Sequence, residues 1–196
     1  MRTASLVLAT RNAHKLAEFR RLFASAHVQL TPLPEGVILP PEDGDTFSAN
    51  ALCKARAAAA ATRRESIGDD SGIEAEALGG APGVRSARYA APNATDEQNL
   101  HKLILQAPPG SALRYVCALA YADPRSGHEH VVLGECAGRM SDAPRGARGF
   151  GYDPVFVPGR DSRRRTMAEL QDHEKDAISH RGNAARALMR WLADSA

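Results

Sequence analysis

The stretch from Ile67 to Ala75 constrains this chain most, because it places two adjacent carboxylates between two apolar runs. Its residues, I-G-D-D-S-G-I-E-A, predict a strand, a tight Ser-Gly turn and a second strand. Such a corner would hold Asp69 and Asp70 close together at a sheet edge. Since neighbouring acids repel each other unless a cation lies between them, the pair predicts a site for a hard ion such as magnesium. A solvated turn is the alternative, because turns favour the same residue types.

Composition limits the classes to which the chain can belong. Its 196 residues, 43% of them apolar, suit one domain over residues 1–196, with room for two lobes. A formal charge of +2 gives no reason to expect a nucleic-acid partner. The three cysteines lack the spacing of a zinc site or a disulfide framework. Because no apolar stretch has the length of a signal peptide or a membrane span, we expect a cytoplasmic protein with no membrane partner.

A polar loop from Thr10 to Lys15 joins a short apolar strand, Leu6 to Ala9, to an amphipathic helix. Backbone N–H groups and the positive end of the helix dipole favour phosphate at such a point, and Lys15 adds a charge. The loop therefore predicts an anion site, although it lacks the pattern of a standard P-loop. A capped helix start with a surface lysine is the alternative.

Glu42 lies in a proline-rich loop, just before a helix that we expect to begin at residues 46–47 and to run through an alanine tract. The carboxylate could complete a metal site with Asp70, or it could act only as a partner of the helix dipole. Asn50 and Lys54, spaced i and i+4, would present a donor and a cation from one side of this helix.

The second half of the chain predicts an irregular loop at residues 78–89, a helix starting at Thr95, and two strands, 114–122 and 130–136, that form a hairpin. Residues 144–154 combine glycines, arginines, two aromatics and an acid. An aromatic that stacks on a base, beside a polar group that reads its edge, is what a nucleobase pocket requires.

Near the C-terminus, Ser179 is the expected cap of a last helix. Lys175, His180 and Arg181 would then cluster at the N-terminus of that helix. A lone histidine there would more often be structural, but three cationic or titratable groups at an anion-friendly helix end favour a ligand site.

Taken together, the segments A-T-R-N-A-H-K, E-D-G-D-T-F-S-A-N-A-L-C-K-A, D-D-S-G-I-E-A-E-A-L-G-G-A-P-G-V-R-S-A-R-Y, G-F-G-Y-D-P-V-F and S-H-R-G resemble the inosine triphosphate pyrophosphatase family, in particular its bacterial dITP/XTP members. The resemblance runs from Ala9 to the last helix. It implies an elongated α/β fold with a central mixed β-sheet flanked by helices and two lobes with a substrate cleft between them. It also implies Mg²⁺, a homodimer, and hydrolysis of a purine nucleoside triphosphate to monophosphate and pyrophosphate.

The resemblance also implies roles for individual residues. It matches the triphosphate-binding loop to Thr10, Arg11, Asn12, Ala13, His14 and Lys15. It matches the proton acceptor and metal ligand to Asp70, a second metal ligand to Glu42, and a substrate contact to Ser71. The base pocket corresponds to Phe150, Gly151, Tyr152 and Asp153, and further substrate contacts to Lys175, His180 and Arg181. Lys54 would help to neutralise the triphosphate, and the sequence leaves open whether Asp69 or Asp70 is the base.

One position departs from the family pattern. Where the family commonly has F-x-E-N-A, this chain has Ala49 in place of the glutamate. The glutamate stands at the capping-box spacing, so its loss costs either helix-start stability alone or some of the activity. Two alternatives therefore stay open: a related Maf-like enzyme for pyrimidine or other modified nucleotides, and a nucleotide-binding module without turnover. The preferred base and the dimer interface are not readable from the sequence.

Overall fold

The computed structural model describes residues 4–24 and 28–195. Two compact units make up the chain, and each combines segments that are distant in sequence. Unit 1 contains residues 1–70, 117–134 and 181–196, and unit 2 contains residues 71–116 and 135–180. A single functional domain over residues 1–196 stays a prediction, as does a substrate cleft.

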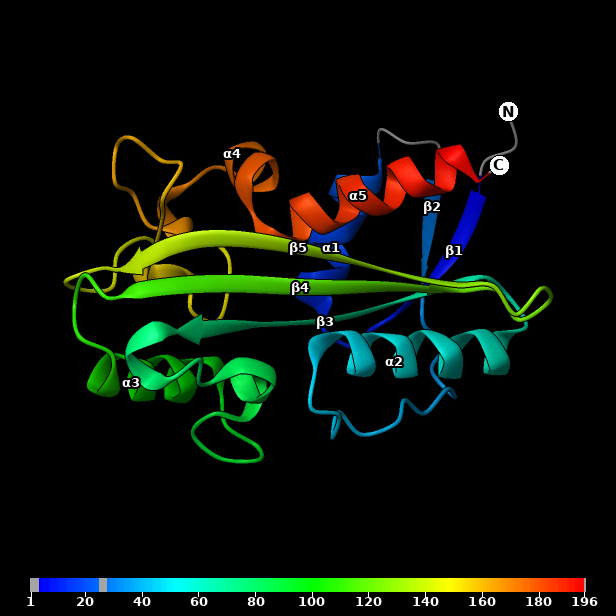
Figure 1. Cartoon of the computed structure of the whole chain (residues 1–196), viewed down its shortest axis with the longest axis horizontal. Coiled ribbons are helices and arrows are strands. Elements are labelled where there is room, and N and C mark those ends of the chain that lie inside the picture. Colours follow the sequence, from blue (N-terminus) through cyan, green and yellow to red (C-terminus); the bar gives the residue numbers. More distant parts are fainter. Residues whose placement is uncertain (1–3, 25–27, 196) are drawn as a thin grey trace. The chain divides into compact units, whose positions relative to one another are not determined.

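Six strands form one sheet in the order β2-β1-β3-β4-β5-β6 (Figure 1). Their bounds are Ala4–Ala9 (β1), Val28–Pro32 (β2), Ser66–Ala75 (β3), Ala112–Ala122 (β4), Glu129–Met140 (β5) and Phe156–Pro158 (β6). β1 pairs in parallel with β2 and β3, whereas β5 and β6 are antiparallel. The α/β class and the mixed sheet are therefore confirmed.

Residues 4–24 and 28–195 contain five α-helices. They are Ala13–Phe23 (α1), Phe47–Thr62 (α2), Asp96–Gln106 (α3), Asp172–Ile178 (α4) and His180–Asp194 (α5). Short 3-10 helices occupy Glu76–Leu78 (η1), Gly83–Arg88 (η2), Asp153–Val155 (η3) and Met167–Glu169 (η4). Within the described residues, no helix is both long and apolar enough to cross a membrane.

The predicted turn at Ser71 and Gly72 is wrong, because β3 continues through both residues without a break. Its first half is paired with β1, from Ser66 opposite Val7 to Gly68 opposite Ala9, and β4 is its other neighbour in the sheet. Sheet partners on both sides satisfy the backbone of an extended strand, and this tertiary pairing overrides the local turn preference. The two acids that follow Gly68 therefore lie inside a strand, just beyond the last residue of β1.

Successive side chains along the strands of unit 1 point to opposite faces of the sheet, and each face packs against different helices. Leu6, Leu8 and Ile67 pack with Phe19 of α1 and Leu188 of α5. The opposite face of β1, formed by Val7 and Ala9, packs with Ala58 of α2. Figure 1 shows α2 on one side of these strands and α1 and α5 on the other. The predicted apolar face of α1 is confirmed, since Phe19 and Phe23 are fully buried.

Close packing of α2 on β3 depends on Gly68. A Cβ atom there would collide with the carbonyl oxygen of Ala51 and lie 2.7 Å from the backbone nitrogen of Ala55. Small residues on both elements therefore bring the helix against the strand, and with it the side chains of Asn50 and Lys54.

Unit 2 has its own core, to which β4, β5 and α3 contribute Tyr115, Met140 and Leu103. Thr95 caps α3, as predicted, and the structure adds a capping box with Gln98. The structure corrects three predictions. β4 and β5 are longer than the predicted strands, and the predicted irregular loop at residues 78–89 contains η2 and a buried Ser86. Helix α4 was not predicted. The missed helix has only seven residues and no apolar stripe that periodicity could reveal.

Candidate active site

Asp69 and Asp70 lie on opposite sides of β3, because successive side chains of a strand point to opposite faces. Asp69 shares the face of Ile67 and contacts Lys15 of α1 and Cys117 of β4. Asp70 shares the face of Gly68 and contacts Asn50 of α2. The expectation that one corner would hold both carboxylates close around a cation is therefore wrong, and its cause is the mistaken turn.

Asp69 is a buried and ion-paired carboxylate, with no exposed surface. Its partner is the ammonium group of Lys15, and the thiol of Cys117 donates to Oδ2 at 3.4 Å. Burial alone would raise the pKa of Asp69, but the charges of Lys15, Arg181 and Lys54 outweigh it and hold this pKa well below its ordinary value. Asp69 therefore stays an anion at any physiological pH.

Asp70 is in the opposite electrostatic state. Burial raises the pKa of its carboxyl group to about 6, and the charge of Glu42 adds to this effect. The charge of Lys54 and a hydrogen bond from Asn50 Nδ2 to Oδ2, 2.8 Å long, act in the other direction but do not cancel it. A carboxyl group that titrates near neutral pH is suited to accept and release a proton.

Lys54 connects this carboxyl group to the loop before α2. Its ammonium group forms an ion pair with Glu42. Burial lowers the pKa of Lys54, but Asp69, Glu42 and Asp70 together raise it above its ordinary value. The lysine therefore remains charged although it is only 6% exposed.

Glu42 and Asp70 fit the donor chemistry of magnesium. This ion binds protein through one or two carboxylates and completes its shell with water and phosphate oxygens. A cation would also relieve the repulsion that helps to raise the pKa of Asp70. Within residues 4–24 and 28–195, no three His, Cys, Asp or Glu side chains are arranged to hold a metal ion.

The loop that follows β1 caps helix α1 and also forms hydrogen bonds to the segment 33–37. Asn12 caps α1, since its side chain accepts a hydrogen bond from the backbone nitrogen of Lys15 at 3.1 Å, and Thr10 accepts one from Asn12. Arg11 instead donates to four carbonyl oxygens in the segment 33–37. The guanidinium group of Arg11 thus holds the start of the loop that carries Glu42, whereas Ala13 and His14 are exposed in the first turn of α1.

Arg181 belongs to the same unit as these groups. Its guanidinium donates to Glu18 of α1 at 3.1 Å, and both side chains are buried. Together with the charges of Lys15 and Lys54, the charge of Arg181 lowers the pKa of Asp69, although Lys54 and Arg181 are also paired with Glu42 and Glu18. Such a concentration of fixed cations can bind phosphate groups.

In unit 2, Asp153 organises the loop predicted as a base pocket. Its Oδ2 accepts from Lys175 Nζ at 2.6 Å and from the backbone nitrogen of Phe150 at 3.0 Å, and its Oδ1 accepts from Tyr115 at 3.1 Å. Gly149 has a φ of 70°, and a Cβ there would collide with the Asp153 carboxylate. Asp153 is thus committed to protein donors, which fits a role in shaping the loop.

The two aromatic residues of this loop differ in environment. Tyr152 is buried, and its hydroxyl group donates to the carbonyl oxygen of Ser86 at 2.7 Å. Phe150 is partly exposed, and the ammonium group of Lys175 lies 5.4 Å from its ring centre. Between them, Gly151 donates to Asp96 at 3.1 Å. Phe150 is therefore the aromatic with a surface available for stacking, while Tyr152 belongs to the core.

The predicted cationic cluster at one helix N-terminus is only partly correct. His180 and Arg181 begin α5, but Lys175 lies in the last turn of α4 and pairs with Asp153. His180 stacks on Tyr115, with ring centres 4.5 Å apart and planes 13° apart. Ser179 lies between the two helices, and its backbone nitrogen donates to Lys175.

Sequence reasoning missed three buried partners of these groups: Glu18, Tyr115 and Cys117. Both Tyr115 and Cys117 lie in β4, which is buried on nearly every residue and therefore shows no alternation that would mark a functional side. Glu18 could have been noticed as an acid beside the apolar face of α1, one turn after Lys15. Ser71 is partly exposed in β3, next to Asp70.

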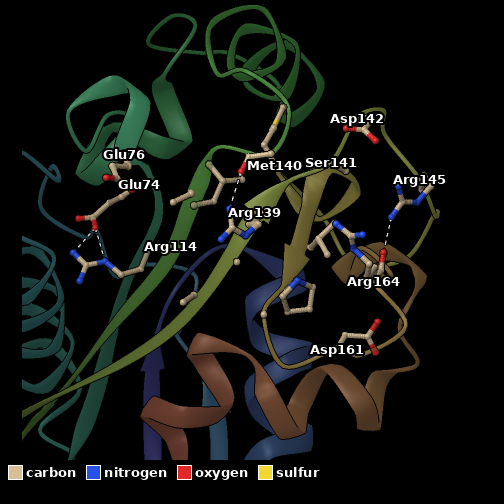
Figure 2. A pocket seen from close by; sticks show the side chains of 18 of the residues that line it. Glu74, Glu76, Arg114, Arg139, Met140, Ser141, Asp142, Arg145, Asp161 and Arg164 are labelled. Carbon is tan, nitrogen blue, oxygen red and sulfur yellow. Dashed lines mark hydrogen bonds and ion pairs between the residues drawn. The ribbon is translucent and has the colours of Figure 1, made fainter.

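A cavity of about 920 Å³ in unit 2 lies apart from these groups, and none of the residues predicted for the site lines it. Figure 2 shows its charged lining, in which Arg114 points to Glu74. Arg139 donates to the carbonyl oxygen of Gly110, and Arg145 pairs with Glu169. Because Glu74, Arg114, Arg145 and Asp161 of this lining are ion-paired within the protein, they give no specific indication of a ligand.

Comparison with known proteins identifies the relatives of this chain. The model of the Ham1 family matches residues 6–191. A dITP/XTP pyrophosphatase of Cutibacterium acnes is 46% identical over 192 residues, which cover 94% of each chain. One of Symbiobacterium thermophilum is 45% identical over 191 residues, covering 95% of this chain and 92% of the relative. The structure of a HAM1 protein from Coxiella burnetii superposes with a TM-score of 0.85 at 38% identity, covering 97% of this chain and 99% of that one.

Proposed function

The chain belongs to the Ham1 family, and on this basis we propose that it hydrolyses non-canonical purine nucleoside triphosphates, such as dITP and XTP, to the monophosphate and pyrophosphate. This reaction would remove these nucleotides before they are incorporated into DNA or RNA. The observation that carries the proposal is the contrast between two adjacent carboxylates: Asp69 is fully buried and paired with Lys15, whereas Asp70 faces Asn50 on the opposite side of β3, and burial raises its pKa.

Asp70 is the base in this proposal. It accepts a proton from a water molecule whose oxygen attacks the α-phosphorus. The new P–O bond forms as the anhydride bond to the β-phosphate breaks, and pyrophosphate leaves with the bonding electrons. In the metal-free site burial raises the pKa of Asp70 to about 6, so this carboxylate is ionised at neutral pH and is a stronger base than an ordinary aspartate. Asp69 does not take this part, since its low pKa makes it a poor base.

The cations of unit 1 bind the triphosphate. Lys15, Lys54 and Arg181 offset its negative charge, which would otherwise repel the incoming water. The backbone N–H of Ala13 adds a hydrogen-bond donor at the positive end of α1, whereas that of Lys15 already binds the Asn12 cap. Thr10 and Asn12 shape this turn and His14 adds a further polar group, whereas Arg11 acts through the loop that it clamps.

Magnesium is the metal that we propose, with Glu42 and Asp70 as its protein ligands. When bound, it supplies positive charge to the phosphate oxygens and lowers the pKa of a coordinated water molecule. Lys54, which pairs with Glu42, offsets the charge of these carboxylates until then.

Base recognition belongs to unit 2. Phe150 stacks on the purine, and Lys175 and His180 offer hydrogen-bond donors to a 6-oxo group. A donor that faces an oxo group is left unpaired by the amino group of adenine, and such a mismatch discriminates strongly. Gly151, Tyr152 and Asp153 position the loop, and Ser71 contacts the substrate next to Asp70.

The assay is pyrophosphate release with magnesium from dITP, XTP, dGTP, dATP and dTTP at equal concentration. We expect fast release from dITP and XTP and slow release from the other three. Release from dTTP alone would support a Maf-like enzyme. Binding of dITP without release from any nucleotide would indicate a module without turnover, and would make Ala49 the residue to examine first.

The mutational control for this assay is a pair of isosteric changes. Asp70→Asn should abolish pyrophosphate release, whereas Asp142→Asn, at an exposed carboxylate, should leave it unchanged. Near-wild-type turnover in Asp70→Asn would refute the role of Asp70 as the base.

We also propose that the protein acts as a homodimer in the cytoplasm, where the nucleotide pool is. The support for both statements is the family resemblance. Light scattering on the eluting protein would test the first, and a mass of one chain would refute it.

A further inference from the structure

Tyr115 lies in β4 and is in contact with two of the groups assigned to base recognition. Its hydroxyl group donates to Asp153 Oδ1 at 3.1 Å. One ring contact is a parallel stack on His180, with centres 4.5 Å apart. The other is Phe156, whose ring centre is 4.3 Å away and whose plane is tilted by 34°. The side chain is only 6% exposed.

A buried tyrosine needs one acceptor for its hydroxyl group, and a backbone carbonyl of the core would suffice. The acceptor here is instead the carboxylate that also binds Phe150 and Lys175. The hydroxyl group therefore helps to fix the carboxylate on which the loop depends. Charge-assisted hydrogen bonds of this kind are stronger than neutral ones.

The ring of Tyr115 restrains a second element. His180 is the first residue of α5, and its imidazole lies nearly parallel to the tyrosine ring. Stacking on a ring that is itself held by Phe156 limits rotation of the imidazole. A single side chain thus holds both the loop of Phe150 and the imidazole of His180.

We propose that Tyr115 is a positioning residue for base recognition, which orients His180 through its ring and the Phe150 loop through Asp153. The inference rests on the proposed function, because it concerns the same substrate. Tyr115 does not touch the reacting atoms, so its loss should weaken binding of the nucleotide and leave the chemical step intact.

Two substitutions separate the contributions of Tyr115. Tyr115→Phe keeps the ring and removes the hydroxyl group, and we expect it to raise KM for dITP about threefold. Tyr115→Leu removes both contacts, and we expect an increase of about tenfold, with kcat within about a factor of two of wild type. Selectivity for dITP over dATP should fall in the same order.

Tyr121 offers a matched control on the same strand. It is also buried, and it packs on Trp191 rather than on any residue assigned to recognition. Tyr121→Leu should lower thermal stability to a similar extent but leave KM and selectivity unchanged. If Tyr115→Leu behaves in the same way as Tyr121→Leu, Tyr115 is a core residue only and the proposal is wrong.

Calorimetric titration with dITP in the Asp70→Asn background separates this inference from the proposed function. The inference requires that Tyr115→Leu lower dITP affinity about tenfold in that background. A wild-type protein without turnover, combined with such a loss of affinity, would refute the proposed function and support the role of Tyr115. Equal affinity with and without Tyr115 would refute the inference, and absence of dITP binding to the wild-type protein as well as to Asp70→Asn would refute both.

Discussion

Replacement of Asp70 by asparagine should make the protein inactive and, in the absence of metal, more stable. Burial and the charge of Glu42 raise the pKa of this carboxyl group from 3.8 to about 6. A raised pKa means that the folded protein holds the proton more tightly than the unfolded chain. Ionising Asp70 therefore costs the folded state free energy, which the neutral amide of Asp70→Asn avoids.

The size of the effect follows from the pKa. Each pKa unit corresponds to about 1.4 kcal/mol, so the gain in unfolding free energy is at most about 3 kcal/mol. Relaxation around the charge reduces it, and we expect about 1–3 kcal/mol above about pH 7. Near pH 4 the carboxyl group of folded wild-type protein is protonated, so the gain should be small there and should grow as the pH rises to about 6. The amide oxygen can still accept the hydrogen bond from Asn50.

Urea unfolding from about pH 4.5 to about pH 8, with a chelator present, measures this difference. Asp142→Asn, which removes an exposed carboxylate, corrects for the general effect of one negative charge less. A stability difference that does not change with pH, or a variant less stable than wild type at about pH 8, would show that the pKa of Asp70 is not raised in the folded protein. Pyrophosphate release from dITP, measured on the same samples, should be absent.

Three further predictions concern the same unit. Magnesium should raise the melting temperature of wild-type protein and shift Asp70→Asn less, as scanning fluorimetry with and without the ion would show; equal shifts would exclude Asp70 as a ligand. Gly68→Ala should lower the free energy of unfolding in urea by about 1–3 kcal/mol, because the new methyl group collides with α2. Gly36→Ala is the control, since a Cβ there would have no atom within 4 Å, and an equal loss of stability in both variants would contradict the prediction. Lys15→Met should cost about 3 kcal/mol at neutral pH by removing the ion pair between Lys15 and the buried Asp69. The pKa of Asp69 is lower in the folded protein than in the unfolded chain, so its ionised form stabilises the fold at neutral pH. The cost of Lys15→Met should therefore shrink in acid as Asp69 becomes protonated, and a cost that does not depend on pH would contradict this prediction.

Short sequence patterns predicted the helix starts, because a helix start is stabilised by residues that are close in sequence. The start of α1 after a polar loop, the Thr46 cap before α2 and the Thr95 cap before α3 were all readable, since a cap is formed by residues within a few positions of each other. The structure places Ala49 three residues after Thr46, where it donates its backbone N–H to the cap and offers no side chain in return. The half-formed box agrees with the expected loss at the helix start.

Contacts between residues far apart in the sequence could not be predicted from sequence patterns. Lys175 was expected beside Arg181 because they are near in sequence, yet it pairs with Asp153 across 22 residues, and Arg181 pairs with Glu18 across 163. Tyr115 gave no signal because its whole strand is buried. Partners of this kind are determined by strand order and helix packing, on which periodicity carries no information.

The two adjacent acids illustrate the boundary between sequence and tertiary structure. Two carboxylates after an apolar run, with lysines and a glutamate nearby in the sequence, were enough to predict an anionic, metal-compatible site. The continuation of β3 through Ser71 and Gly72 instead depends on strands from elsewhere in the chain that pair with it in the sheet. Because β3 is continuous here, Asp69 points toward Lys15 and Asp70 points toward Asn50. The pKa of Asp69 is therefore lower than that of an ordinary aspartate, and the pKa of Asp70 is higher.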